Sequence, residues 1–299
     1  MSSTLDEAFF KFLSLLELTD NQSSFIAEKH KAIRAKIEES SIFKVQNTLL
    51  YGSYERSSQI RPAYDNEWTL DVDILVILDD SEKSKYLERT FTSGHDLLMD
   101  DLQKAVGKFQ GLEIVRDTPA ISIKWQTQKV IVELTPALNR KDGGFYIPKN
   151  TFFEDWIISD PFADAEALTK GNQALNNNLK PLVKALKCWN RQNDYFLPSF
   201  AIETVAYHSA TKSKFRGYEV ELRWFFKSLL EFGGKNLPSP SGKNGDVFID
   251  LKSNESLIRK TLTSLQHAYD LEKNGDHSLA IREMQNIFGI PFPNSPGGR

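Results

Sequence analysis

The segment Asp71–Leu78, DVDILVIL, constrains the fold more than any other part of this sequence. It is rich in β-branched residues and apolar on both faces after Asp73, which predicts a central, buried strand. Two acidic residues, Asp71 and Asp73, stand at its start. Alternate residues of a strand point to the same face, so we expect both carboxylates to project together.

Strand and helix patterns divide the 299 residues into two regions. We expect helices over the first forty residues and over 82–107. Strands are expected at 47–51, 71–78, 113–116, 120–124 and 129–134. The Gly- and Pro-containing stretch 140–161 reads as a connector, helical patterns dominate from Ala163 onward, and 291–299 reads as a flexible tail. The change from mixed to helical patterns near residue 165 predicts an α+β chain with two lobes. We expect a catalytic lobe over 1–165, which includes the N-terminal helices, and a helical lobe over 166–299. A ligand-binding cleft is expected between them.

Composition excludes several classes of protein. The single cysteine, Cys188, leaves no disulfide framework and no multi-cysteine zinc site, and we expect it to be a small buried residue. No apolar run is long enough to span a bilayer and the N-terminus does not resemble a secretory signal, so the cytoplasm is the expected location. The net charge of −3 argues against a constitutive DNA- or RNA-coating role.

Three features of the sequence carry chemistry. Gly52-Ser53 ends a strand, where glycine lets the backbone approach a phosphate and serine adds a donor; an ordinary turn is the alternative. Asp71 and Asp73 offer hard oxygen ligands to Mg²⁺, and a solvated strand end is the alternative. Glu133 lies in an apolar strand, VIVEL, where it is either a third metal ligand or an ion-paired edge-strand residue.

Together these features resemble the DNA polymerase β-like nucleotidyltransferase superfamily. The segments YGSYERSSQIRP, DVDILVIL and VIVELTPAL are similar to those of the bacterial cGAS/DncV-like nucleotidyltransferases, which make cyclic oligonucleotide second messengers in anti-phage defence. The resemblance covers residues 47–210. It implies a polymerase β-like lobe with a mixed sheet and helices, followed by an all-helical C-terminal lobe.

The resemblance also implies roles for residues of the helical region. Lys187 corresponds to a lysine that contacts the triphosphate. Ser199 and Phe200 correspond to a phosphate contact and a base-stacking aromatic ring. The alternatives are a solvated helix lysine, a helix N-cap and a core residue, and Trp189 is open to the last of these as well.

Two departures from the family pattern matter. The third acid is usually Asp, whereas this chain has Glu133, so metal spacing or activity can differ. The zinc-binding insertion of the animal DNA sensor is missing, which argues against activation by DNA. Some family members are joined to other proteins through their C-terminus, so the C-terminal tail is a candidate conjugation site.

The sequence thus predicts a template-independent nucleotidyltransferase that makes cyclic or linear oligonucleotides from nucleoside triphosphates, ATP among them. Asp71, Asp73 and Glu133 would hold two Mg²⁺ ions, or Mn²⁺, while Gly52, Ser53, Lys187, Ser199 and Phe200 would bind the nucleotide. Expected partners are regulatory or effector proteins of a defence operon, without membrane or constitutive DNA binding. The alternatives are a transferase that modifies an RNA end, a protein or a small molecule, and an inactive pseudo-transferase that binds nucleotides or RNA.

Overall fold

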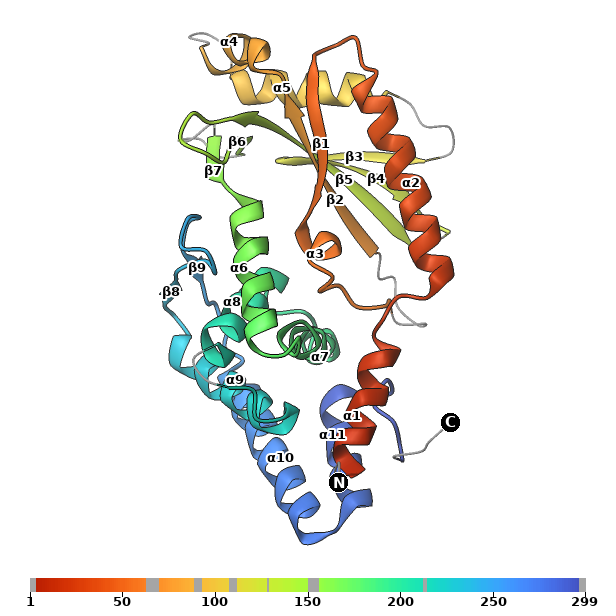
Figure 1. Cartoon of the computed structure of the whole chain (residues 1–299), viewed down its shortest axis with the longest axis vertical. Coiled ribbons are helices and arrows are strands. Elements are labelled where there is room, and N and C mark those ends of the chain that lie inside the picture. The colour runs from red at the N-terminus through yellow and green to blue at the C-terminus, as the bar shows by residue number, and fades with distance from the viewer. Residues whose placement is uncertain are drawn as a thin grey trace. The chain divides into compact units, whose positions relative to one another are not determined.

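The computed structural model describes residues 4–62, 70–88, 93–107, 112–127, 129–149, 156–211 and 214–295 (Figure 1). The chain divides into two compact units. The sheet unit is Leu18–Ala163, and the helical unit combines Met1–Glu17 with Asp164–Arg299. Each unit is described by itself.

The sheet unit is built on a seven-stranded sheet, counted within the described residues. The strand order is β1-β2-β5-β4-β3, and β6 pairs with both β5 and β7. Among the described strands, only β2 and β5 pair in parallel. Strand β2 has β1 on its other side, so the predicted central strand is confirmed. The strands are β1 (Val45–Tyr51), β2 (Leu70–Leu78), β3 (Glu113–Asp117), β4 (Ala120–Trp125), β5 (Val130–Asn139), β6 (Phe145–Pro148) and β7 (Trp156–Ser159).

Strand β5 is longer than predicted, because it continues through Pro136 to Asn139. The pairs with β4 end at Leu134 and those with β6 begin at Leu138. Pro136 lies between these two sets of pairs, on the side of β5 that faces β4 and β6. No described strand pairs with β5 at that point, so a residue without an N–H group is tolerated there. The prediction of a connector over 140–161 was wrong, since β6 and β7 lie within it.

One face of the sheet is covered by two helices, α2 (Asp20–Glu38) and α5 (Gly94–Val106) (Figure 1). Helix α2 begins with the capping box that its sequence offers: Thr19 Oγ1 accepts from the N–H of Gln22 at 3.2 Å, and Gln22 Oε1 accepts from the N–H of Thr19 at 3.0 Å. The apolar residues of both helices form one cluster with those of β2 and β5. Its members include Ile26, Ile33, Ile37, Leu98, Met99, Leu102, Val72, Ile74, Val130 and Val132.

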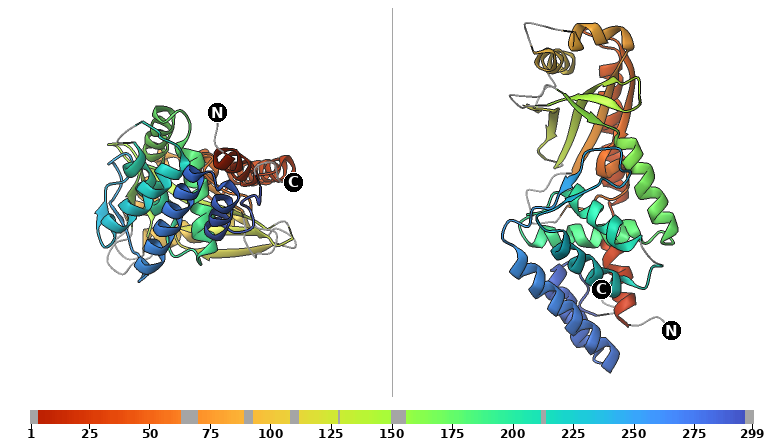
Figure 2. Two further views of the ribbon diagram at one scale, coloured as in Figure 1. Left: turned by 90° about the horizontal axis from the view of Figure 1, so that it is seen from below. Right: turned by 90° about the vertical axis from the view of Figure 1, so that its left-hand side faces the viewer.

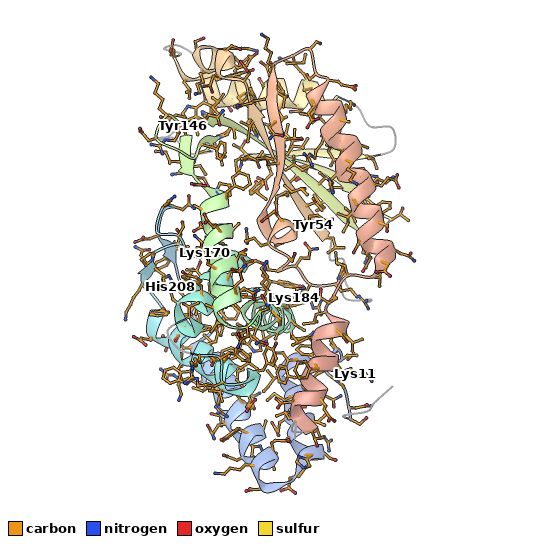
Figure 3. The ribbon with its side chains drawn as sticks, viewed as in Figure 1. Lys11, Tyr54, Tyr146, Lys170, Lys184 and His208 are labelled. Atoms are coloured by element: carbon orange, nitrogen blue, oxygen red, sulfur yellow. The ribbon has the colours of Figure 1, made fainter. Side chains whose placement is uncertain are left out.

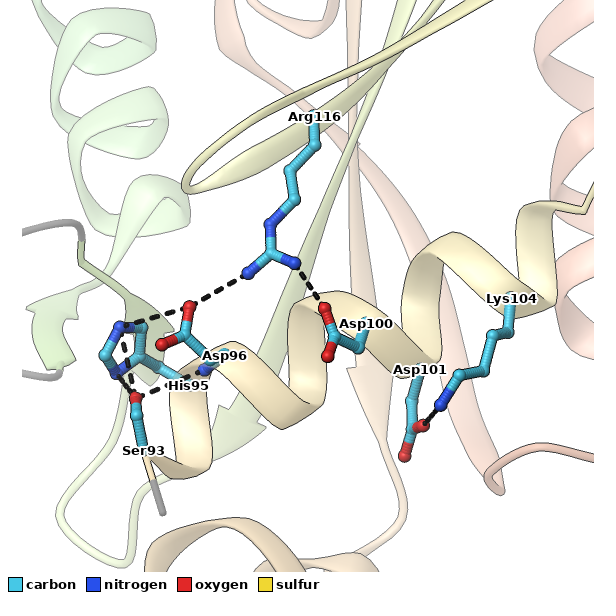
Figure 4. A network of polar contacts seen from close by, with 7 residues as sticks. All are labelled: Ser93, His95, Asp96, Asp100, Asp101, Lys104 and Arg116. Carbon is cyan, nitrogen blue, oxygen red and sulfur yellow. Dashed lines mark hydrogen bonds and ion pairs between the residues drawn. The ribbon is translucent and has the colours of Figure 1, made fainter.

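The predicted helical stretch 82–107 is interrupted. It comprises the 3₁₀ helix η1 (Asp80–Glu82), α4 (Lys83–Leu87) and α5, with residues 89–92 outside the described part of the chain. Asp79 caps η1, and its side chain accepts from the N–H of Ser81 at 3.0 Å. The polar contacts in Figure 4 tie α5 to the edge strand β3, where Arg116 bonds both Asp96 and Asp100.

The helical unit confirms the predicted helical region after residue 163, and Figure 2 gives two further views of its helices. Trp189 is buried in it, with its ring 4.7 Å from that of Phe226 between centroids. Within the described residues, no helix is both long and apolar enough to cross a membrane. The elements are α1 (Thr4–Leu15), α6 (Pro161–Ala174), α7 (Leu179–Gln192), α8 (Ser199–Ala210), α9 (Tyr218–Phe232), α10 (Glu255–Asn274) and α11 (His277–Phe288), with the short strands β8 (Asn236–Leu237) and β9 (Val247–Phe248).

Two expectations about the chain ends need correction. Helix α1 groups with the helical unit and not with the sheet, because Phe9 and Phe12 on its apolar stripe pack against Phe288 of α11. The segment after α11 is not simply a flexible tail, since Phe292 is fully buried. Residues 296–299 lie outside the described residues.

Candidate active site

The three acids lie on one face of two neighbouring strands. Asp73 of β2 is paired in register with Glu133 of β5, and Asp71 precedes Asp73 by one alternation on the same face. Asp71 is exposed and the other two are partly buried, whereas Val72 and Val132 point to the helix-covered face. We call this arrangement of Asp71, Asp73 and Glu133 the acid face. Neighbouring strands are about 4.8 Å apart, so the backbone brings Asp73 and Glu133 close together.

Glu133 is held by a residue that the sequence analysis missed. Ser122 of β4 is paired in register with Glu133, and its hydroxyl donates to Glu133 Oε1 at 3.1 Å. Strand β5 has β2 on one side and β4 on the other, so the alternative of an edge-strand glutamate is wrong.

The acid side chains are not drawn together around a common point. Among the described residues, no group of three His, Cys, Asp or Glu side chains is arranged to hold a metal ion. Carboxylates that share a face repel each other, and Ser122 gives Glu133 a separate partner. The backbone places the three acids in adjacent positions of two paired strands.

Gly52 makes the closest approach to the acid face. Its φ is +72°, and a Cβ atom added to it would lie 1.8 Å from Asp73 Oδ2, so a larger residue cannot occupy the position without displacing that carboxylate. The strand-to-helix turn predicted at Gly52-Ser53 is present. Its helix, α3 (Gly52–Glu55), is a single turn, so the expected dipole contribution is small.

Tyr54 attaches the Gly52-Ser53 turn to helix α2. Its ring packs edge-on against His30 of α2, with centroids 5.9 Å apart. Figure 3 labels Tyr54 where α3 follows β1. The turn that carries Ser53 is thereby attached to a helix of the core.

A hydroxyl pair borders the acid face. Tyr51 Oη and Thr135 Oγ1 are 2.8 Å apart, and both residues were missed as site residues. Burial raises the pKa of the Tyr51 phenol, and the negative charges of Asp73 and, more weakly, Glu133 raise it further. The phenol therefore stays protonated at neutral pH, within the field of both carboxylates.

The predicted nucleotide contacts of the helical unit have different environments. Lys187 is buried, 6% exposed, and its Nζ lies 2.6 Å from Glu203 Oε1, so the alternative of a solvated lysine is wrong. Ser199 is exposed at the first position of α8, whose N-cap is Pro198, so the N-cap alternative is wrong too. Phe200 is partly buried.

Two predictions about buried residues of α7 are confirmed. Trp189 is a core residue, as one alternative had it. Cys188 is fully buried as predicted, and burial raises its pKa to about 11.

A family model matches more than half of the chain. Residues 3–172 match the Second Messenger Oligonucleotide or Dinucleotide Synthetase domain. The chain belongs to this family. It is a nucleotidyltransferase that makes oligonucleotide second messengers, as the sequence motifs predicted.

Two curated relatives agree with this assignment. The chain is 23% identical to a cyclic AMP-AMP-AMP synthase of an Acinetobacter species, over 98% of this chain and 86% of the relative. It is also 23% identical to a probable cyclic nucleotide synthase of Bacillus cereus, over 82% of this chain and 81% of the relative.

Solved structures confirm the predicted fold. The apo form of Vibrio cholerae DncV matches with a TM-score of 0.73 and 14% identity, over 97% of this chain and 96% of that one. The same enzyme in complex with the linear intermediate 5′-pppA(3′,5′)pG matches with a TM-score of 0.72 and 13% identity, over 98% and 97% of the two chains.

Proposed function

We propose that this synthase joins nucleoside triphosphates, ATP among them, into a cyclic or linear oligonucleotide at the acid face. The observation that carries the proposal is the in-register pairing of Asp73 with Glu133 on parallel strands, with Asp71 on the same face and Gly52 against Asp73. A pseudo-transferase would have no need to keep three acids and a glycine in this arrangement.

The acid face fits divalent metals in its donor chemistry. Asp71, Asp73 and Glu133 supply hard carboxylate oxygens, which suit Mg²⁺ and Mn²⁺. When bound, two such ions would supply charge neutralisation at the phosphates and a lower pKa for the attacking hydroxyl. The hydroxyl of Ser122 binds one oxygen of Glu133, Oε1, and a carboxylate has a second oxygen that can bind an ion.

The residues around the acid face bind and orient the substrates. The hydroxyl of one nucleotide attacks the α-phosphorus of another, a new P–O bond forms, and the bond to pyrophosphate breaks. The proton of that hydroxyl passes to a carboxylate of the acid face or to water. Gly52 leaves room for a phosphate beside the backbone, and Ser53 offers a hydroxyl donor. Repetition of the same step within one linear product would close a ring.

Nucleotide contacts from the helical unit rest on the family resemblance. Lys187 is proposed to contact the triphosphate, with Ser199 as a phosphate contact and Phe200 as a stacking ring. An ammonium group carries three donors, so the ion pair of Lys187 with Glu203 is compatible with a second acceptor. Regulatory or effector proteins remain predicted partners.

The test is to incubate the protein with all four nucleoside triphosphates and Mg²⁺ or Mn²⁺ and to identify the products by mass spectrometry. Asp73→Asn and Glu133→Gln should each lower turnover at least a hundredfold, roughly the cost of misplaced reacting groups, without unfolding the chain. Asp142→Asn, at a carboxylate whose side chain is 88% exposed, is the control. Near-normal turnover of Asp73→Asn would exclude the acid face as the reaction site. Product that forms only after an RNA, protein or small-molecule acceptor is added would favour the alternative transferase.

A further inference from the structure

The hydrogen bond between Tyr51 and Thr135 joins two strands that are not neighbours. Tyr51 ends β1 and Thr135 lies in β5, while β2 runs between these strands. Tyr51 is paired with Asp73 of β2, and Thr135 with Leu75. The hydroxyl pair therefore passes over β2 between Asp73 and Leu75, on the same face as the three acids.

The hydroxyl pair also marks a chemical boundary on this face. On one side lie Asp73 and Glu133. On the other side begins an apolar cluster against which the Tyr51 ring packs, formed by Leu75, Ile77, Ala137, Phe145 and Ile147. Thr135 is 2% exposed. A buried hydroxyl without a partner costs about 1–3 kcal/mol, so each of the two hydroxyls depends on the other.

The pair is connected to those parts of the proposed reaction site that lie in the sheet unit. Tyr51 directly precedes Gly52, whose backbone meets the Asp73 carboxylate. Thr135 follows Glu133 on the same face of β5. One hydrogen bond thus links the Gly-Ser turn, the central acid strand and the strand of the third acid.

We infer that Tyr51 and Thr135 are positioning residues of the synthase reaction. Their hydroxyl pair sets the inner limit of the space open to the carboxylates of Asp73 and Glu133 and to the ions that these would hold. This inference rests on the proposed function of the acid face. Without the hydroxyl pair, the side chains of Tyr51 and Thr135 are no longer fixed to each other over β2, and the carboxylates of Asp73 and Glu133 beside them gain room to move.

Two conservative variants test the inference. Tyr51→Phe keeps the ring and Thr135→Val keeps the shape, and each removes one hydroxyl. Each should lower kcat about tenfold with an unchanged KM for ATP, as a displacement smaller than 1 Å implies. Binding of Mn²⁺ with a non-reactive ATP analogue, followed by electron paramagnetic resonance, should weaken by a similar factor. The double variant should be no worse than the poorer single one, because the residues act as a pair. Thr135→Ser, which keeps the hydroxyl, should restore both readouts.

Tyr86→Phe is the matched control. The Tyr86 hydroxyl donates to Asp101 at 3.0 Å, also within the sheet unit, and its ring belongs to the cluster under the helix-covered face. Its loss should lower the melting temperature but leave kcat per folded molecule and Mn²⁺ binding unchanged.

The outcomes separate this inference from the proposed function. If Asp73→Asn is inactive while Tyr51→Phe and Thr135→Val keep normal kcat and Mn²⁺ binding, the hydroxyl pair has no positioning role. If Asp73→Asn itself remains active, the acid face is not the reaction site. Should Tyr51→Phe fail to fold, the comparison of Thr135→Val with Thr135→Ser decides: equal Mn²⁺ binding and kcat in these two would overturn the inference.

Discussion

Gly52 has the least freedom to change of all the residues at the acid face. Its positive φ disfavours any side chain, and its hydrogen atoms face Asp73 Oδ2 at a distance that leaves no room for a methyl group. The conformation and the contact are separate constraints, and a second glycine of the sheet unit allows them to be measured apart.

We predict that Gly52→Ala lowers kcat about a hundredfold, because the new methyl group displaces the Asp73 carboxylate by more than 1 Å. The backbone strain itself should cost about 1–2 kcal/mol of stability. Gly143→Ala is the control: Gly143 has a φ of +90°, and a Cβ there would meet nothing within 4 Å. Product formation and thermal melting are the measurements. Equal losses of kcat in the two variants would contradict the steric argument.

At this scale, strand periodicity predicted correctly that Asp71 and Asp73 share a face. It could not reveal Ser122 or Thr135 as neighbours of the acids. Those contacts depend on which strand lies beside which and in what register, and period-two alternation carries neither piece of information.

At the scale of elements, α7 shows that a helical pattern predicts a helix but not the ion pairs of its buried residues. The pattern predicted the helix, but Lys184 and Lys187 are both buried in it, paired with Glu17 and Glu203. A lysine in a helical sequence is usually exposed, and it becomes buried only when neighbouring helices bring a carboxylate to it. The partners lie far from α7 in sequence or on another helix, so local periodicity cannot identify them.

We predict that Lys187→Ala destabilises the chain by about 3–5 kcal/mol, because the buried Glu203 carboxylate loses the positive charge that is paired with it. Lys187→Met combined with Glu203→Leu should recover most of that stability. If Lys187 contacts the triphosphate, this double variant should still have a KM for ATP roughly ten- to a hundredfold higher than that of the unchanged protein. Denaturant unfolding and steady-state kinetics measure the two effects.

Lys170→Ala is the reference for this pair. Lys170 and Glu166 form an exposed ion pair on α6, with side chains 71% and 65% exposed, and exposed pairs contribute little. Its loss should leave stability and KM nearly unchanged. A double variant at Lys187 and Glu203 with a normal KM would reduce the pair to a structural role.

At the scale of the whole molecule, the helical unit is assembled from two distant parts of the chain, and the sheet unit is inserted between them. The change of pattern near residue 165 predicted the second crossing between units. It could not assign α1, because an amphipathic stripe indicates that a helix has a partner but not which one. The partner is the segment around α11, where Phe9 and Phe12 meet Phe288 and Phe292.

Phe292 offers a test of the packing between α1 and the segment around α11. It is fully buried, and its ring lies 5.2 Å from that of Phe9 and 5.1 Å from that of Phe12, between centroids. Phe292→Ala should cost about 3–5 kcal/mol in the helical unit through lost burial and a cavity. Hydrogen exchange followed by mass spectrometry should show α1 and α11 losing protection.

The ring contacts of Phe292 with Phe9, Phe12 and Phe288 lie within the helical unit, as does the hydrogen bond that its carbonyl accepts from Gln285. The amides of β2 and β5 should therefore keep their protection in this variant. Ile290→Ala is the control, two residues earlier in the same segment and 93% exposed, and surface changes of this kind usually stay within about 0.5 kcal/mol. If exchange in β2 and β5 rose as much as in α1 and α11, the two units would unfold as one. The inserted sheet unit would then depend on the packing between the chain ends, and Phe292 would contribute to the stability of the acid face as well.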